Sequence, residues 1–108
     1  MRERLPNRRE ALVLTVPHPI PGSAILYTVS IGFDSFGAPK ELFIECNKLT
    51  TAMNISGLEI ATLVSIALQH GSSLQELAAA MPREDNNDPQ GAAGAILDAV
   101  ISALSQGN

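Results

Sequence analysis

Cysteine and long apolar runs are nearly absent from this chain. Cys46 is the single cysteine among 108 residues, so no intramolecular disulfide and no Cys-x-x-Cys metal site can form. No apolar run approaches the roughly 18 residues that span a bilayer. The arginines near the N-terminus have no apolar segment behind them, which argues against a secretory signal. We therefore expect a protein of the reducing cytoplasm with no membrane partner.

Positive charge is also scarce, and most of it lies at one end. Seven Lys and Arg residues stand against eleven Asp and Glu residues, for a formal net charge of −4. Four of the seven are arginines within the first ten residues, which leaves three positive and nine negative charges from Ala11 onward. A body of that charge repels phosphate backbones, so DNA is excluded as a partner.

The length and the change in charge predict two parts. A chain of 108 residues is near the usual size of one domain. Residues 1–10 are polar and basic, with Pro6 and Asn7 opposing regular structure, so they predict an N-terminal arm. Residues 11–106 are then expected to form the single folded domain.

Three strands are expected before the middle of the chain. Branched and apolar side chains over residues 11–16 favour a strand, and the prolines of residues 17–22 are expected to end it in a loop. Apolar and polar residues alternate over 24–31, which is typical of a half-buried strand. Residues 34–37 (Asp-Ser-Phe-Gly) indicate a hairpin turn into a third strand over 41–46.

Helices are expected from residue 53 onward. Apolar residues recur at three- and four-residue intervals over 53–70, and Gly71 can end that helix with a positive φ angle. Ser73 and Glu76 have the spacing of a capping box for a second helix over 74–81. These elements predict an α+β fold: a three-stranded antiparallel meander with about three helices packed on one face.

The last helix is expected over residues 90–104. Asp88 followed by Pro89 is typical of an N-cap with proline in the first turn. Gly91 and Gly94 lower helix propensity there by about 1 kcal/mol each. Such glycines either allow close packing on another helix or let the helix end fray.

The long helix has a face that mixes polar and apolar residues. A polar stripe runs along it at helical spacing, made of Ser56, Glu59, Thr62, Ser65 and Gln69. Apolar residues project among these side chains, which favours a contact surface over a solvated face. The predicted interface for a partner or a second copy comprises Ile55, Leu58, Glu59, Thr62 and Ile66.

An anion site is a weaker hypothesis. Lys48, Thr50 and Thr51 lie between the third strand and the long helix, and helix N-termini bind phosphates. The glycine pattern of a phosphate-binding loop is missing, so a solvated loop over residues 47–54 is the favoured alternative. Arg8 and Arg9 could clamp a nucleotide phosphate or a partner carboxylate, although such an arm is usually solvated.

No catalytic constellation or metal site is expected. Cys46 is interpreted as a packed thiol, because a reactive one needs nearby positive charge. His70 ends the long helix, where the helix dipole favours its charge, and His18 lies far from it in sequence. The helix pair over residues 60–81 has the outline of a DNA-reading motif, but its second helix has no Lys or Arg, so DNA reading is rejected.

Four stretches together resemble the TSCPD domain. They are Leu5-Pro6-Asn7-Arg8-Arg9, Leu42-Phe43-Ile44, Leu63-Val64-Ser65-Ile66-Ala67-Leu68-Gln69-His70-Gly71 and Gly91-Ala92-Ala93-Gly94-Ala95-Ile96-Leu97-Asp98. That domain is found near the C-terminus of cobalamin-dependent ribonucleotide reductases and as short free-standing proteins of bacteria and prophages. The resemblance covers nearly the whole chain and implies an association with nucleotide reduction.

Two departures from the family limit what the resemblance implies. Family members tend to have a glycine beside the lysine after the third strand, whereas Lys48 here is followed by Leu49 and Thr50. The reductases also have a barrel with several cysteines, for which this chain has no room. We therefore expect a non-catalytic accessory or regulatory domain, without cofactor or metal, that binds a reductase-type protein or a nucleotide. The alternative is a self-associating structural domain, a homodimer with no ligand.

Overall fold

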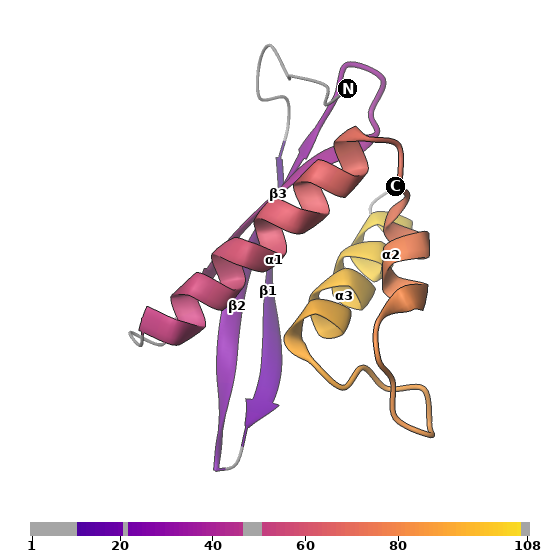
Figure 1. Cartoon of the computed structure of the whole chain (residues 1–108). Helices are drawn as coiled ribbons and strands as arrows, with labels where there is room; N and C mark the ends of the chain where they lie inside the picture. The colour runs from indigo at the N-terminus through magenta and orange to yellow at the C-terminus, as the bar shows by residue number, and fades with distance from the viewer. Residues whose placement is uncertain (1–10, 21, 47–50, 107–108) are drawn as a thin grey trace.

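The computed structural model describes residues 11–20, 22–46 and 51–106 (Figure 1). This part of the chain forms an antiparallel sheet followed by helices, so the expected α+β fold is confirmed. Its elements are β1 (Ala11–Ile20), β2 (Ser23–Phe33), β3 (Pro39–Cys46), α1 (Thr51–Gln69), α2 (Leu74–Ala80) and α3 (Ala92–Gln106). The sheet order is β1-β2-β3, as a meander requires.

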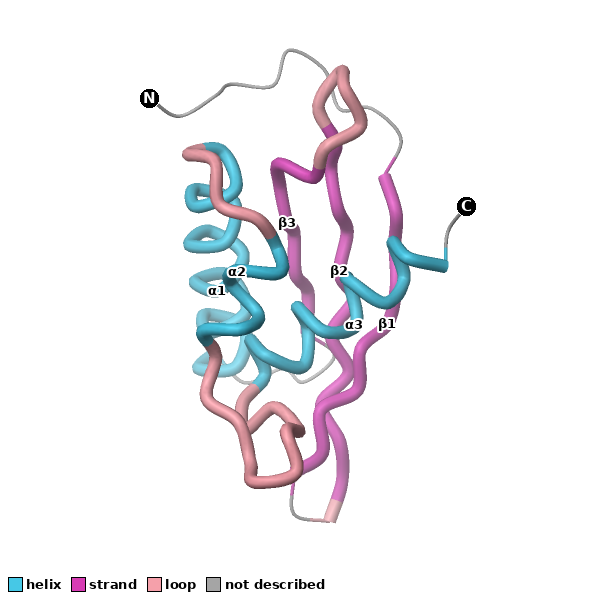
Figure 2. Tube along the Cα trace, turned by 90° about the vertical axis from the view of Figure 1, so that its right-hand side faces the viewer, coloured by secondary structure: helices cyan, strands magenta, loops and turns pink. Residues whose placement is uncertain are grey.

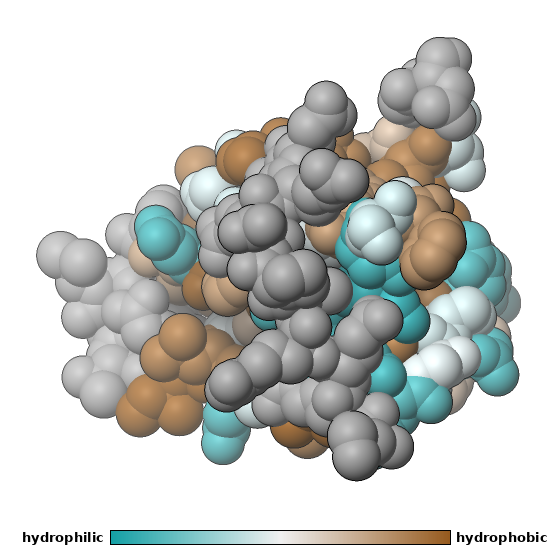
Figure 3. All heavy atoms as spheres, turned by 90° about the horizontal axis from the view of Figure 1, so that it is seen from above, coloured by the Kyte–Doolittle hydropathy of each residue, from teal (hydrophilic) through white to brown (hydrophobic). Residues whose placement is uncertain are grey.

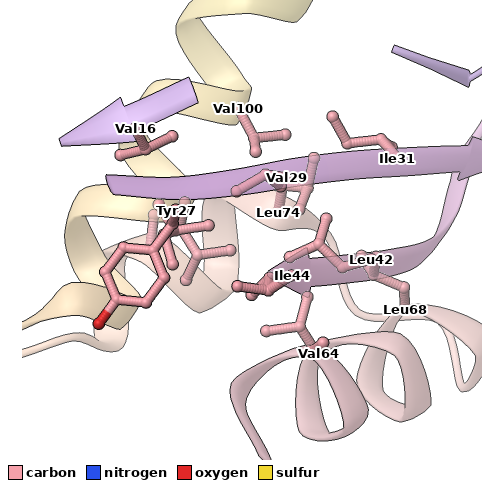
Figure 4. Packing of buried hydrophobic residues seen from close by; sticks show 14 of the residues in the cluster. Val16, Tyr27, Val29, Ile31, Leu42, Ile44, Val64, Leu68, Leu74 and Val100 are labelled. Atoms are coloured by element: carbon pink, nitrogen blue, oxygen red, sulfur yellow. The ribbon is translucent and has the colours of Figure 1, made fainter. Parts of the chain in front are cut away.

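The core lies between one face of the sheet and the helices. Side chains at alternate strand positions point to that face, and those of Val29 and Ile31 on the central strand are fully buried. Figure 4 shows Val100 of α3 packing toward Val29 of β2, and Val64 of α1 packing toward Ile44 of β3. In Figure 2, α3 crosses in front of β2 and β1, while α1 lies beside β3. The helices therefore enclose a single apolar cluster.

Helix α1 is joined to β3 by side-chain hydrogen bonds to the strand backbone. The N–H of Leu42 donates to Ser65 Oγ at 2.9 Å, and the same hydroxyl donates to the Leu42 carbonyl at 3.2 Å. Gln69 Nε2 donates to the Lys40 carbonyl at 3.0 Å. Lys40 Nζ in turn donates to the carbonyl of Leu68 at 3.3 Å, close to the negative end of the helix dipole. These contacts occupy the edge of β3 that does not pair with β2.

Small residues allow α1 to come this close to the strand. Gly57, Ala61 and Ser65 follow one another at four-residue spacing, which puts them on one side of the helix. All three are buried. A Cβ atom at Gly57 would lie 3.2 Å from Ile44 Cγ2, tighter than ordinary packing. The helix backbone therefore lies almost directly against β3.

The position of Ser65 and Gln69 corrects the expected polar stripe. Both side chains are buried inside the domain, whereas the sequence places them in the polar stripe of a surface that contacts a partner. Polar side chains tolerate burial when they are hydrogen-bonded, and here the free backbone groups of β3 supply the partners. The polar stripe thus changes role along the helix and becomes part of the core near its C-terminal end.

The proline segment is also corrected. Strand β1 continues through Pro17 and Pro19 to Ile20, where a loop is expected from the sequence. Pro17 pairs with Leu26 and Pro19 with Ala24. A proline is tolerated in a strand when its nitrogen faces an unpaired edge, and β1 is an edge strand. The prolines therefore mark the outer side of the sheet and do not end the strand.

The turn between β2 and β3 forms where it is expected. Asp34 Oδ1 accepts hydrogen bonds from the N–H groups of Ala38 at 3.0 Å and Phe36 at 2.8 Å, and these bonds lower the pKa of the Asp34 carboxyl. Gly37 has a φ angle of 85°. The turn holds Phe36 at the tip of the hairpin, 93% exposed.

The expected end of α1 and the capping box of α2 are confirmed. Gly71 has a φ angle of 104°. Glu76 N–H donates to Ser73 Oγ at 3.0 Å, and Ser73 N–H donates to Glu76 Oε1 at 2.9 Å. Helix α1 begins at Thr51, so the expectation of a loop as far as residue 54 is wrong for residues 51–54.

The expected start of α3 is wrong by two residues. Asp88 is not its N-cap, because residues 84–88 close a turn in which Glu84 N–H donates to the Asp88 carbonyl at 2.8 Å. Pro89 forms an isolated bridge with Arg83, and the helix begins only at Ala92. A Cβ atom at Gly94 would lie 2.8 Å from Pro89 Cβ. Close packing at Gly94 is thus confirmed, against Pro89 of the preceding loop and against Met81, the C-cap of α2.

Replacing Ser65 by alanine tests the contact between α1 and β3. Ser65→Ala leaves a buried N–H and a buried carbonyl of Leu42 without their partner, so the free energy of unfolding should fall by about 2 kcal/mol. Thr62→Ala is the matched control, because the Thr62 hydroxyl is exposed and donates only to Leu58 O in its own helix; its effect should stay within about 0.5 kcal/mol. Urea unfolding measures both, and equal losses would contradict the role of Ser65.

Candidate functional site

The predicted interface residues lie on one exposed side of α1. Ile55 and Leu58 are 47% and 60% exposed, Glu59 and Thr62 are exposed, and Ile66 is half-buried. Four of these five side chains therefore reach the surface. The opposite side of the helix is the one that packs on β3 through Gly57, Ala61 and Ser65 and on the core through Val64.

Leu63 belongs to the same exposed side, although the sequence reading missed it. Its side chain is 68% exposed. The apolar residues of α1 occur at too many positions around the helix for all of them to face one sheet edge, and that excess is the signal that could have identified Leu63. We name Ile55, Leu58, Glu59, Thr62 and Leu63 the α1 outer surface.

The α1 outer surface is less polar than its sequence indicates. Thr62 Oγ1 donates to the carbonyl of Leu58 at 2.8 Å, so its hydroxyl donor is used inside the helix. Glu59 is the one charged residue of the set. Exposed aliphatic side chains on a helix that is held rigidly from behind are typical of protein contact surfaces.

Hydrophobic residues reach the molecular surface elsewhere too. Figure 3, which views the molecule from above, shows brown hydrophobic patches between teal hydrophilic ones. The most exposed large apolar side chain of the described residues is Phe36 at the hairpin tip. It stands alone on its turn, whereas the α1 outer surface has three apolar side chains on one element.

Most of the predicted anion-site residues lie outside the described residues. This applies to Arg8, Arg9, Lys48 and Thr50. Thr51 is the first residue of α1, and its side chain is not among those described. The anion site at this loop therefore remains a prediction.

The cysteine and the two histidines are not part of the α1 outer surface. Cys46 is half-buried against the core and pairs in register with Tyr27. Burial raises the pKa of Tyr27, and the neighbouring Cys46 adds to this. His18 is half-buried, and its Nδ1 atom is buried without a hydrogen-bond partner in the described part of the chain. His70 is exposed at the end of α1.

Arg83 holds the loop between α2 and α3 in place. Its guanidinium donates twice to the Asp98 carboxylate, at 2.8 Å each, and also to the carbonyls of Ala78 at 2.9 Å and Asn87 at 3.1 Å. An open polar hollow beside it is lined by Arg83, Glu84, Asp85, Asn86 and Gln90. Because four hydrogen bonds occupy the guanidinium, its role is structural and not ligand recognition.

The described residues contain no group of three His, Cys, Asp or Glu side chains that could hold a metal ion. Within them, no helix is both long and apolar enough to cross a membrane. No family model matches the sequence, and no curated protein or solved structure matches it either. The resemblance to the TSCPD domain accordingly remains a prediction from the sequence.

The Arg83–Asp98 ion pair predicts a loss of stability in acid. The hydrogen bonds from Arg83 hold the pKa of the Asp98 carboxyl below its usual range, so the unfolded chain binds protons more readily than the folded one. Stability from this pair is therefore complete above about pH 4 and falls as the pH drops through the folded pKa. Asp98→Asn should flatten the acid side of a plot of unfolding free energy against pH.

Arg83→Gln is the complementary control for this prediction. Without the guanidinium, the Asp98 carboxyl loses the interaction that lowers its pKa, so this variant should flatten the same part of the curve. Chemical unfolding at several pH values between 2 and 6 provides the measurement. An acid slope in Asp98→Asn equal to that of the wild type would contradict the assigned role.

Proposed function

We propose that this chain is a non-catalytic interaction module that binds a protein partner through the α1 outer surface. The observation that carries the proposal is the exposure of three aliphatic side chains on one side of one helix: Ile55, Leu58 and Leu63. Burying each on binding would contribute roughly 1–2 kcal/mol. A central apolar patch with a polar rim is the usual anatomy of such an interface.

The attachment of α1 supports this function. The helix is fixed along β3 through Ser65 and Gln69, so its outer side chains keep their positions before any partner arrives. Preorganisation of this kind reduces the entropy lost on binding. A rigid helix face suits a partner with a matching apolar groove.

The kind of protein that we propose as the partner is taken from the resemblance of the sequence to the TSCPD domain. The TSCPD-like stretches of this sequence favour a reductase-type protein of nucleotide metabolism, to which this chain adds as an accessory or regulatory subunit. Three of the four stretches that carry the resemblance lie in the described part of the chain. Two of them contribute Leu42 and Ile44 of β3 and Ser65 and Gln69 of α1. They form the joint between α1 and β3, which is the part of the fold that presents the proposed surface.

Two alternatives belong to the same proposal. Self-association through the α1 outer surface would make the chain a homodimer with no ligand. Nucleotide binding would rest on Lys48, Thr50, Thr51, Arg8 and Arg9. A nucleotide at a hundred times its dissociation constant should raise the free energy of unfolding by about 2.7 kcal/mol, so thermal melts with and without deoxynucleotides test it directly.

The double variant Leu58→Ser, Leu63→Ser tests the α1 outer surface. Both side chains are exposed, so the variant should keep the wild-type melting temperature to within about 2 °C. Its affinity for a cobalamin-dependent ribonucleotide reductase of the same cell, measured by calorimetry, should fall at least about thirtyfold, the loss expected for a central apolar pair.

Phe36→Ser is the matched control, since it removes an exposed apolar side chain from the hairpin tip. It should bind the reductase as the wild type does. Two results would overturn the proposal. One is a wild-type chain with no affinity for the reductase, and the other is a double variant that binds the reductase as tightly as the wild type does. Sedimentation of the same samples tests the alternative, because a homodimer formed through α1 would be lost in the double variant.

A further inference from the structure

The two edges of the sheet differ in their backbone hydrogen bonding. Leu42 and Lys40 direct their backbone groups away from β2, because Ser65 and Gln69 reach them from α1. Residues of an antiparallel pair alternate between bonding the neighbouring strand and facing away from it. Within the described strands the register is irregular only between Gly32 and Phe33, so from Leu42 onward this alternation fixes the direction of the backbone groups.

The alternation can be followed to β1 through the strand register. Leu42 pairs with Ile31, and Ile31 pairs with Leu12. The backbone N–H and C=O groups of Leu42 point away from β2, so those of its partner Ile31 point toward β1. There they form hydrogen bonds with the backbone groups of Leu12, which therefore point toward β2. The N–H and C=O groups of Val13 and Thr15 must then face outward, away from the sheet.

These outward groups have no partner in the described part of the chain. No hydrogen bond outside the strand ladder involves Val13 or Thr15. Val13 is also 59% exposed, and Thr15 is exposed beside it on the same face of the sheet. An edge with unpaired donors and acceptors is a template for another strand.

The prolines restrict where a strand can add. Pro17 and Pro19 have the same orientation as Val13 and Thr15, so their nitrogens face outward and offer no N–H. This orientation explains why β1 keeps its ladder with β2 through both prolines. It also leaves residues 11–15 as the section of the edge that can both donate and accept.

We propose that residues 11–15 of β1 pair antiparallel with the same residues of a second copy, which joins two three-stranded sheets into one of six strands. Strand β1 contains no Lys, Arg, Asp or Glu, so two copies bring no like charges together. Natural edges are commonly protected by a lysine, and here the prolines protect only the far half. A two-fold axis makes this contact self-complementary.

The contact between the two β1 strands is small, and its area limits the affinity of the dimer. Five residues of one strand on each side bury far less than the roughly 1,200 Å² of a standard interface. In Figure 2 the C-terminal end of α3 extends past β1, so its last turns add contact area beside the paired strands. We expect a weak dimer with a dissociation constant in the micromolar range.

Val13→Pro tests the pairing directly. The substitution removes an outward N–H and keeps the ladder with β2, as Pro17 and Pro19 already do in the same strand. Sedimentation equilibrium should show the dissociation constant rising at least tenfold. Val13→Thr is the matched control, because it keeps the N–H and the branched side chain, and its dimer should match that of the wild type.

Two further measurements keep the inference testable if Val13→Pro fails to fold. Thr15→Pro removes another outward N–H of the same segment and should weaken the dimer equally. In the wild type, hydrogen exchange at the Val13 and Thr15 amides should slow at least threefold between 10 µM and 1 mM protein. Three results would overturn the inference: a wild-type chain that is monomeric at 1 mM, folded proline variants that dimerise as tightly as the wild type, or exchange rates that do not depend on protein concentration.

The α1 double variant separates this contact from the proposed function. Leu58→Ser, Leu63→Ser should leave the β1 dimer unchanged while it loses the reductase. If that variant abolishes the dimer and Val13→Pro does not, the copies associate through α1, and the inference about β1 is wrong.

Discussion

The hydrogen bonds between the free edge of β3 and the side chains of Ser65 and Gln69 are the contact on which this structure depends. A sheet of three strands has two edges, and unpaired backbone groups near a core are costly. Here a helix takes the place of a fourth strand, because small residues let its backbone approach and two polar side chains satisfy the strand. The position of α1 then decides which of its residues are buried and which are exposed.

The functional proposals follow from this asymmetry. Because one side of α1 packs against β3, the apolar side chains of Leu58 and Leu63 face outward, where they form the surface that we propose for a partner. With the β3 edge occupied, the β1 edge is the side where the sheet can extend. The two surfaces use different physics, since one is apolar side-chain burial and the other is backbone pairing, so they can act independently.

Local chemistry explains what the sequence could predict. The Asp34 turn, the end of α1 at Gly71 and the capping box of Ser73 and Glu76 depend on residues within a few positions of one another, and all three form as expected. The outer surface of α1 was also largely predictable, because exposure follows from helical periodicity. Only Leu63 was missed there, since periodicity alone does not say how wide the buried side is.

The expectations that were wrong have one cause in common: each depends on contacts between segments that are distant in the sequence. Pro17 and Pro19 break a central strand but not an edge strand with its nitrogens outward, and strand order is not visible in the local sequence. Ser65 and Gln69 are assigned to a polar stripe on a contact surface, because their actual partners are backbone atoms more than twenty residues away in the sequence. Pro89 is drawn into a bridge with Arg83, so it cannot open α3. Each outcome depends on which segments meet in three dimensions.

Amide hydrogen exchange of the dilute chain tests the central claim most directly. Leu42 N–H lies on a sheet edge, yet Ser65 Oγ accepts its hydrogen bond inside the core. The account predicts that this amide exchanges only through global unfolding, while the edge amides of Val13 and Thr15 exchange rapidly. Exchange at Leu42 as fast as at Val13 would show that α1 does not close the β3 edge, and would contradict the account.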